Sequence, residues 1–295
     1  MSDITPDSPS VLTALISLGV ALVTTLLVTP IKYWFDSKAL LKKMQIEYEY
    51  EQKKSLKILI GKYHGRMIEA GERINARLWK VHGHHEKGWL NYEKTNQNFT
   101  NTTLYRLLNI IYLCFKLEED AIFIDQRISE KNDLYFLYYS KAIIKSITDV
   151  EKLFLGIEHD FLLGRDHVLR DNLKKICDLC HTTNGFIDLN SFETLLKNKK
   201  KEFLPVTEFL FGLTKEEPRN RWDRIMIFHL LVLMMLNRFG YEVHKTPFDK
   251  FTNITKKMNN KKIINNSIDW FKKQGFDEME IKMVSSALND TFKDL

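Results

Sequence analysis

The chain has 295 residues, of which 44% are hydrophobic and 28% charged, with six prolines and twelve glycines. This composition excludes an intrinsically disordered chain, and the scarcity of helix-breaking residues favours long helices over sheet. The net charge of +6 suits a surface beside anionic lipid at least as well as a nucleic-acid groove. Three cysteines are too few to cross-link a secreted fold of this size, so we expect a reducing compartment.

The first predicted element is an uncharged run from Val11 to Ile31, which is long enough for a transmembrane helix. Its helix would extend about 31 Å, close to the thickness of a bilayer core. Acidic Asp3 and Asp7 precede it, whereas a cleaved signal peptide begins with basic residues, so we expect a retained single-pass anchor. Four lysines on the other flank predict an outside N-terminus and a cytoplasmic body, and are candidates for contact with lipid or phosphate: Lys32, Lys38, Lys42 and Lys43.

One face of this run carries small side chains at helical spacing, namely Ala14, Ser17, Ala21, Thr24 and Val28. Small residues let a second helix approach closely, so this face predicts homo-oligomerisation, with a pore along the axis as a further alternative. Two other interpretations stay open. Small residues are common in membrane helices, and the run could instead be the buried core helix of a soluble protein.

Apolar residues keep a helical period over residues 32–82, which predicts one long stalk helix. Three glycines interrupt this helix and predict a seam where a neighbour packs closely: Gly61, Gly65 and Gly71. The polar stretch 83–103 is typical of a loop. Helical blocks are then predicted at residues 104–128, 133–156 and 166–181.

An uncharged run from Ile225 to Leu236 is too short to cross a membrane and predicts a central buried helix over residues 222–238. Near the C-terminus, Gly275 is a predicted helix C-cap and Asp277 a predicted N-cap.

We therefore predict an all-α fold in which an N-terminal transmembrane helix continues into a long stalk helix and a cytoplasmic helical bundle. The predicted segments are a short extracytoplasmic N-terminus (1–10), the transmembrane helix (11–31), the stalk (32–82), the bundle core (83–244) and a C-terminal helical appendage (245–295).

The motif Cys177-Asp-Leu-Cys180-His181 has the spacing of covalent haem attachment, in which two thiols bind the porphyrin and the histidine ligates iron. Haem of this type is attached outside the cytoplasm, which conflicts with the predicted topology. A zinc site completed by His159, by His167 or by the cluster of His82, His84 and His85 is a second hypothesis, although no second C-x-x-C and no spaced histidine pair completes a four-ligand set. Inert buried cysteines on a packed helix are the default interpretation, and we expect no cofactor.

Arg224 and His229 match an R-x4-H pattern and so resemble the active site of HEPN ribonucleases, in which paired arginine and histidine residues, usually from two subunits, cleave RNA. Similar spacings occur at Arg77 to His82 and at Arg238 to His244. Residues five apart lie about 140° apart around a helix, so Arg224 and His229 would share a site only near a frayed end or across a dimer. A core histidine and a surface arginine are the structural alternative.

Other enzyme motifs are missing: the sequence contains no P-loop, no G-x-G-x-x-G, no H-E-x-x-H and no G-x-S-x-G. Basic clusters at 197–201 and 256–262 have the chemistry to bind phosphates of nucleic acid, a nucleotide messenger or lipid. Solvated surface charge explains them equally well.

The runs EYEYEQKK, IGKYHGR and ARLW, placed after the apolar segment, are similar to a group of bacterial membrane-tethered helical proteins. The resemblance covers about residues 11–180 and implies a bacterial inner-membrane location, but no reaction. The leading hypothesis is a membrane-anchored interaction or effector protein that forms homo-oligomers and acts in stress or anti-phage defence, with a partner protein or RNA from a neighbouring gene. The alternatives are a membrane-tethered HEPN-like ribonuclease using Arg224 and His229, and a ligand-gated pore.

Overall fold

The structure, a computed structural model, describes residues 9–90, 97–149, 153, 155–157, 166–217 and 219–293. Of the described residues, 81% are helical and only 2% lie in strands, which confirms the all-α class. It divides into two compact units, Met1–Lys54 and Ser55–Leu295.

The first unit contains α1 (Pro9–Val23), a π-helical turn η1 (Thr24–Val28) and the beginning of α2 (Thr29–Gly83). Pro30 explains the π-helical turn, because proline has no N–H for the carbonyl four residues earlier and its ring crowds that carbonyl. The backbone hydrogen bond here joins residues five apart instead of four: the N–H of Thr29 donates to the carbonyl of Thr24.

Three helices and the second part of α2 form the centre of the second unit. Helix α4 (Lys131–Thr148) packs against both α3 (Gln97–Asp120) and α8 (Arg221–Phe239). Every residue of α8 from Arg221 to Leu236 is buried, which confirms the predicted central helix.

Smaller elements flank this centre. On one side, three helices pack against α3: α5 (Arg170–Leu179), α6 (Leu189–Asn198) and α7 (Lys200–Leu210). An antiparallel hairpin joins α5 to α6 and consists of β1 (His181–Thr182) and β2 (Gly185–Phe186). Single 3-10 turns complete the connections: η2 (His85–Lys87), η3 (Ala121–Phe123), η4 (Gln126–Ile128) and η5 (Glu242–His244).

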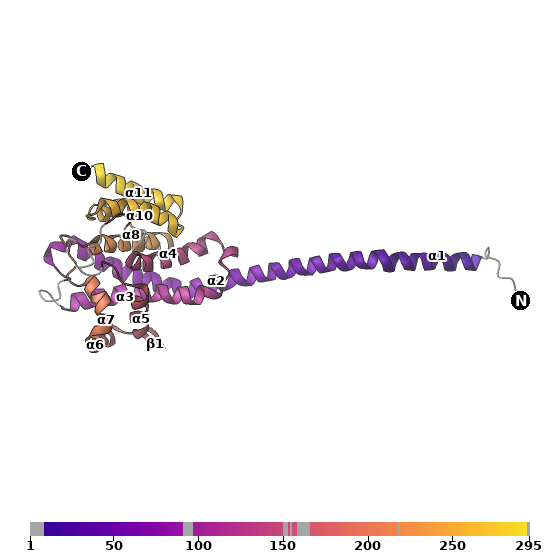
Figure 1. Cartoon of the computed structure of the whole chain (residues 1–295), viewed down its shortest axis with the longest axis horizontal. Helices are drawn as coiled ribbons and strands as arrows, with labels where there is room; N and C mark the ends of the chain where they lie inside the picture. Colours follow the sequence, from indigo (N-terminus) through magenta and orange to yellow (C-terminus); the bar gives the residue numbers. More distant parts are fainter. Residues whose placement is uncertain are drawn as a thin grey trace. The chain divides into compact units, whose positions relative to one another are not determined.

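Three C-terminal helices flank the other side, where α10 packs on α4 and α11 packs on α9 and α10: α9 (Phe248–Thr255), α10 (Lys261–Gln274) and α11 (Glu278–Lys293). Figure 1 shows α10 and α11 on the opposite side of the body from α5, α6 and α7. Gly275 ends α10 with φ +88°, and the N–H of Glu280 donates to Asp277 Oδ1 at 2.9 Å. Both predicted caps are therefore confirmed.

The predicted loop at 83–103 is wrong for its last seven residues, because α3 already begins at Gln97. The reason is local: the hydroxyls of Thr102 and Thr103 donate to the carbonyls of Asn98 and Phe99, both at 2.6 Å, so polar side chains fit inside the helix. Residues 91–96 lie outside the described residues. The predicted block 133–156 is also too long, since α4 ends at Thr148 before an extended Asp149.

Of the three glycines in the predicted seam, only Gly71 meets a close neighbour. A Cβ there would lie 2.8 Å from Met235 Cε and 3.3 Å from Leu236 Cδ2, so this glycine lets α2 approach α8. A Cβ on Gly61 or Gly65 would meet no described atom within 4 Å.

Candidate functional site

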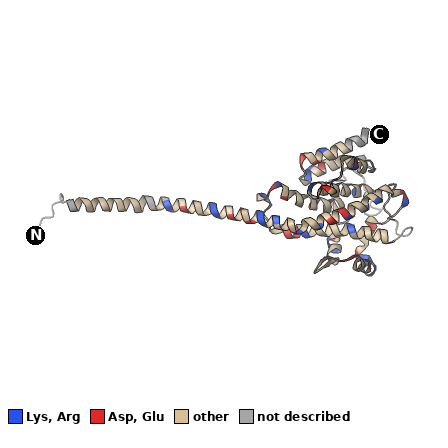
Figure 2. Ribbon diagram, turned by 180° about the vertical axis from the view of Figure 1, so that it is seen from behind, with Lys and Arg blue, Asp and Glu red and all other residues tan. Residues whose placement is uncertain are grey.

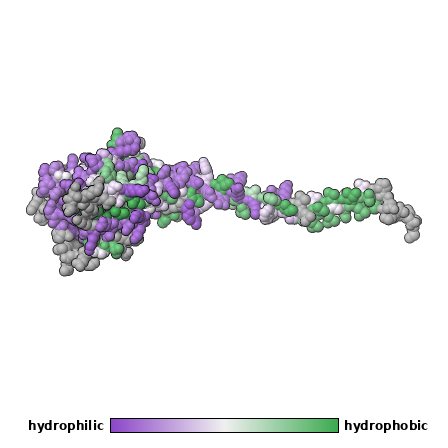
Figure 3. All heavy atoms as spheres, turned by 90° about the horizontal axis from the view of Figure 1, so that it is seen from above, coloured by the Kyte–Doolittle hydropathy of each residue, from purple (hydrophilic) through white to green (hydrophobic). Residues whose placement is uncertain are grey.

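The most distinctive surface of the molecule is the apolar helix near the N-terminus. Among the described residues, it is the one helix whose length and composition would let it cross a membrane, and its apolar window has no buried residue. Figure 3 shows the hydrophobic colouring gathered on it. Nine large apolar side chains are 51% to 65% exposed: Leu12, Leu15, Ile16, Leu18, Val20, Leu22, Val23, Leu26 and Ile31.

This exposure has a large free-energy consequence. Removing one such side chain from water is worth roughly 1.5–3 kcal/mol, so covering nine half-exposed ones is worth on the order of 10 kcal/mol. A soluble monomer rarely leaves so large a continuous apolar surface in water.

The polar groups inside this helix are satisfied by its own backbone. Ser17 Oγ donates to the Ala14 carbonyl at 2.8 Å, and Thr24 Oγ1 donates to the Val20 carbonyl at 2.6 Å. Within hydrocarbon every polar group needs such a partner, so these hydroxyls are compatible with lipid. Four of the five predicted small-face residues are exposed, whereas the side chain of Val28 lies outside the described residues.

The charged flank follows directly. Figure 2 shows Lys and Arg beginning only after the apolar stretch. Lys38 Nζ lies 3.8 Å from the centroid of the Trp34 ring, which forms a cation–π contact within the charged flank. All four predicted lysines of the flank are exposed: Lys32, Lys38, Lys42 and Lys43.

The structure places Arg224 and His229 in the middle of the body, both 0% exposed. Arg224 Nη1 donates to the Ser146 carbonyl of α4 at 2.8 Å, whereas His229 Nε2 bonds to Asn75 Oδ1 of α2 at 2.8 Å. The two side chains therefore face different helices. The expected alternative of a surface arginine is wrong, because Arg224 is fully buried, and this burial lowers its pKa to about 9. RNA cleavage by this pair stays a prediction.

His229 belongs to an aromatic cluster with the buried His82 and the half-buried Trp79. The ring centroids lie 5.3 Å apart for His82 and His229 and 4.5 Å apart for Trp79 and His82. Because Asn75 Oδ1 can only accept, His229 Nε2 carries the proton, and Nδ1 is buried with no hydrogen-bond partner among the described residues. Burial lowers the pKa of His82 to about 4 and that of His229 well below its usual value, so both rings are neutral.

The other two R-x-H matches have structural contacts. The guanidinium carbon of Arg77 lies 4.1 Å from the centroid of the Phe99 ring. Arg238 Nη1 forms ion pairs with Asp277 at 2.6 Å and Glu280 at 2.8 Å, which fasten α8 to α11.

The C-x-x-C-H motif lies at the end of α5. Both thiols are buried, and burial raises the pKa of Cys177 well above its usual value and that of Cys180 to about 12. His181 lies on β1 and its Nδ1 bonds to Tyr112 Oη at 2.7 Å. Within the described parts of the chain, no three His, Cys, Asp or Glu side chains gather closely enough to hold a metal ion, and His159 lies outside those parts.

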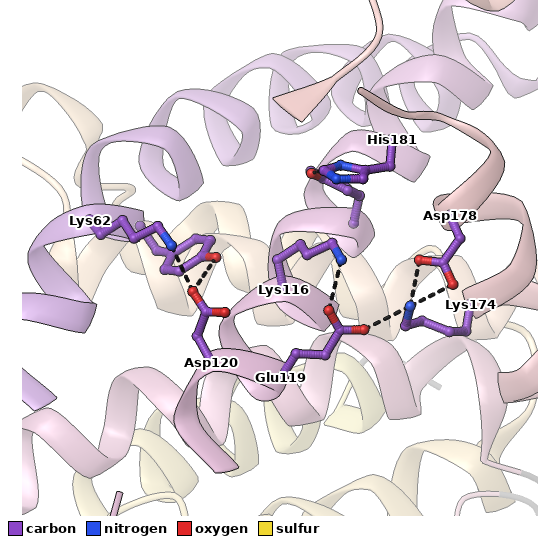
Figure 4. Close-up of polar contacts among 9 residues, drawn as sticks. Lys62, Lys116, Glu119, Asp120, Lys174, Asp178 and His181 are labelled. Atoms are coloured by element: carbon purple, nitrogen blue, oxygen red, sulfur yellow. Dashed lines mark hydrogen bonds and ion pairs between the residues drawn. The ribbon is translucent and has the colours of Figure 1, made fainter. Parts of the chain in front are cut away.

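A network of ion pairs joins α3 and α5, and it was not predicted from the sequence. Lys174 Nζ lies 2.7 Å from Glu119, which also accepts from Lys116 at 2.8 Å, and Lys174 is paired with Asp178. Figure 4 shows this chain of contacts beside the separate pair of Lys62 and Asp120 at 2.7 Å. The i,i+4 spacing of Lys174 and Asp178 was a visible signal, but the link between helices was not.

Comparison with protein-family models, curated proteins and solved structures finds no match to this chain.

Proposed function

We propose that this chain is a bacterial inner-membrane protein that acts as an interaction or effector protein in stress or anti-phage defence and assembles through its N-terminal span. The observation that carries the proposal is the unburied apolar surface of α1, which water would leave unfavourably exposed. The lysine flank supports a cytoplasmic body, because positively charged residues accumulate on the inner side of a span.

Self-association is supported by the face of α1 that carries Ala14, Ser17 and Ala21. Its side chains are small and its hydroxyl is bonded to its own helix, so a second copy can approach without leaving polar groups unsatisfied. Within lipid, close backbone approach of this kind is a main source of helix association.

The test is the oligomeric state of the full chain in detergent micelles, measured by light scattering and by chemical cross-linking in vesicles. We expect oligomers for the wild type and a shift to monomers for Ala21→Leu, because the larger side chain blocks close approach. Gly19→Leu is the matched control, since position 19 lies about 160° around the helix from position 21. Its oligomers should persist.

A monomeric wild type, or equal dissociation in both variants, would contradict assembly through this face. Cleavage of RNA by the purified protein that disappears in His229→Ala would instead favour the ribonuclease hypothesis. Ion flux through protein-containing vesicles would favour the pore.

A further inference from the structure

A groove crosses the body between α2, α3 and the β1–β2 hairpin. Two adjoining hollows of about 250 and 370 Å³ form it, and they share Ala70, Arg73, Tyr105 and Asn109 in their linings. Their combined size falls within the range of sites for small molecules. We call it the arginine groove, after its lining residues Arg66, Arg73 and Arg106.

The arginine groove holds more positive charge than its acidic residues neutralise. Glu69 pairs with Arg73 at 2.6 Å, but we find no described carboxylate paired with Arg66, Arg106 or the neighbouring Arg77. The pKa of Arg106 is lowered by burial and by the nearby charge of Arg73. The pKa of Arg77 is lowered to about 10 by burial and by the charge of Arg106. Like charges therefore crowd this part of the body, and a bound anion would relieve their repulsion.

The second acid in the lining is already engaged. Asp188 is the N-cap of α6, where its side chain accepts from the Ser191 N–H at 3.0 Å and from Ser191 Oγ at 2.6 Å. These bonds hold its carboxylate on α6, and among the described residues it forms no ion pair with an arginine. The lining therefore holds three guanidinium groups against two carboxylates.

One wall of the arginine groove is aromatic. The Tyr105 and Tyr112 rings lie 5.4 and 5.2 Å from that of Phe186, measured between centroids. Tyr105 Oη donates to the Ile187 carbonyl at 2.9 Å, and Tyr112 Oη bonds to His181 at 2.7 Å. These bonds fasten the Tyr112 ring to the hairpin and the Tyr105 ring to the residue that follows it, so the wall is held in place before any ligand arrives.

We propose that the arginine groove binds a nucleotide, with its phosphates on Arg66, Arg73 and Arg106 and its base against the aromatic wall. Planar guanidinium groups match phosphate oxygens with two parallel hydrogen bonds, and every base offers a flat face to an aromatic side chain. The amide of Asn109 lines both hollows, where it can donate to a phosphate or to the base.

The experiment is calorimetric titration of the full chain in detergent, at low salt, with ATP and separately with pyrophosphate. We expect ATP to bind more tightly than pyrophosphate, because only ATP reaches the aromatic wall. Arg66→Gln should weaken ATP binding by about five- to tenfold, since it removes a charge-assisted contact. Arg66 is exposed and without an ion pair in the described structure, so this substitution leaves the fold intact.

Arg127→Gln is the matched control, because Arg127 is exposed and paired with Asp125 outside the groove. Its affinity for ATP should equal that of the wild type. Arg106→Lys keeps the charge but loses the planar fork, and should weaken binding severalfold. Absence of ATP binding, or equal weakening by Arg66→Gln and Arg127→Gln, overturns the site. Equal affinity for ATP and pyrophosphate overturns the nucleotide as its ligand.

Discussion

Two helices of this protein are rich in apolar residues, and the structure treats them in opposite ways. The apolar window that includes α1 has no buried residue, whereas α8 is buried from Arg221 to Leu236. Hydrophobic content alone therefore does not determine which helix enters the core.

The polar residues distinguish the two helices. In the apolar window that includes α1, Ser17, Thr24 and Thr25 donate to carbonyls of Ala14, Val20 and Ala21 in the same helical segment. The polar residues of α8 are held by other elements. Asp223, for example, accepts the N–H groups of Asn259 and Asn260 at 2.7 and 2.8 Å. A helix made for lipid satisfies its polar groups alone, and a core helix depends on its neighbours.

Removing one polar side chain from each helix tests this difference and should give the largest effect. Arg221 is 4% exposed, bonds to Glu217 through Nε and Nη2, and donates through Nη1 to the carbonyls of Glu208, Phe209 and Phe211. Arg221→Ala leaves the largely buried carboxylate of Glu217 and three carbonyls without this partner, so we expect the free energy of unfolding to fall by about 3–5 kcal/mol.

Denaturant titration of the helical circular dichroism signal in detergent measures this loss. The matched change in the apolar helix, Ser17→Ala, should stay within about 0.5 kcal/mol because the hydroxyl bonds only to its own backbone. A loss below about 1 kcal/mol for Arg221→Ala would show that α8 does not depend on this residue.

Features set by neighbouring residues could be predicted from the sequence, whereas contacts between distant segments could not. The caps at Gly275 and Asp277, and the buried run in α8, were predictable because local chemistry determines them. The contact of Arg224 with Ser146 joins residues 78 positions apart, and no spacing rule anticipates it. The arginine groove was missed for the same reason, since its lining comes from three separate elements.

Lowering the pH should have the next largest effect, and it acts on two buried histidines where α2 meets α8, namely His82 on α2 and His229 on α8. The pKa of His82 is about 4 in the folded chain and 6.5 in an ordinary setting, so between these values the unfolded chain binds a proton that the folded chain does not. Stability is therefore complete above pH 6.5 and declines as the pH falls, by on the order of 3 kcal/mol at pH 4. His229 acts in the same direction.

Urea titrations of the full chain from pH 7 to pH 4.5 test this decline. His82→Phe should make the decline shallower, because the side chain at this position stays large but no longer titrates, while His229 still contributes. The exposed His84 supplies the control, and His84→Phe should leave the slope unchanged. A wild-type free energy of unfolding that stays constant between pH 6.5 and 5 would contradict burial of the neutral imidazoles.

The smallest effect concerns how closely α2 approaches α8. At Gly71 a Cβ would lie 2.8 Å from Met235 Cε, so Gly71→Leu overfills this contact and should cost about 1–3 kcal/mol. At Gly65 a Cβ meets open space, so Gly65→Leu should instead stabilise the helix by about 0.5–1 kcal/mol through better helix propensity. Thermal unfolding of the two variants side by side measures the difference. Because both changes are glycine to leucine in one helix, opposite signs isolate the contact with α8, and equal signs would refute a close approach at Gly71.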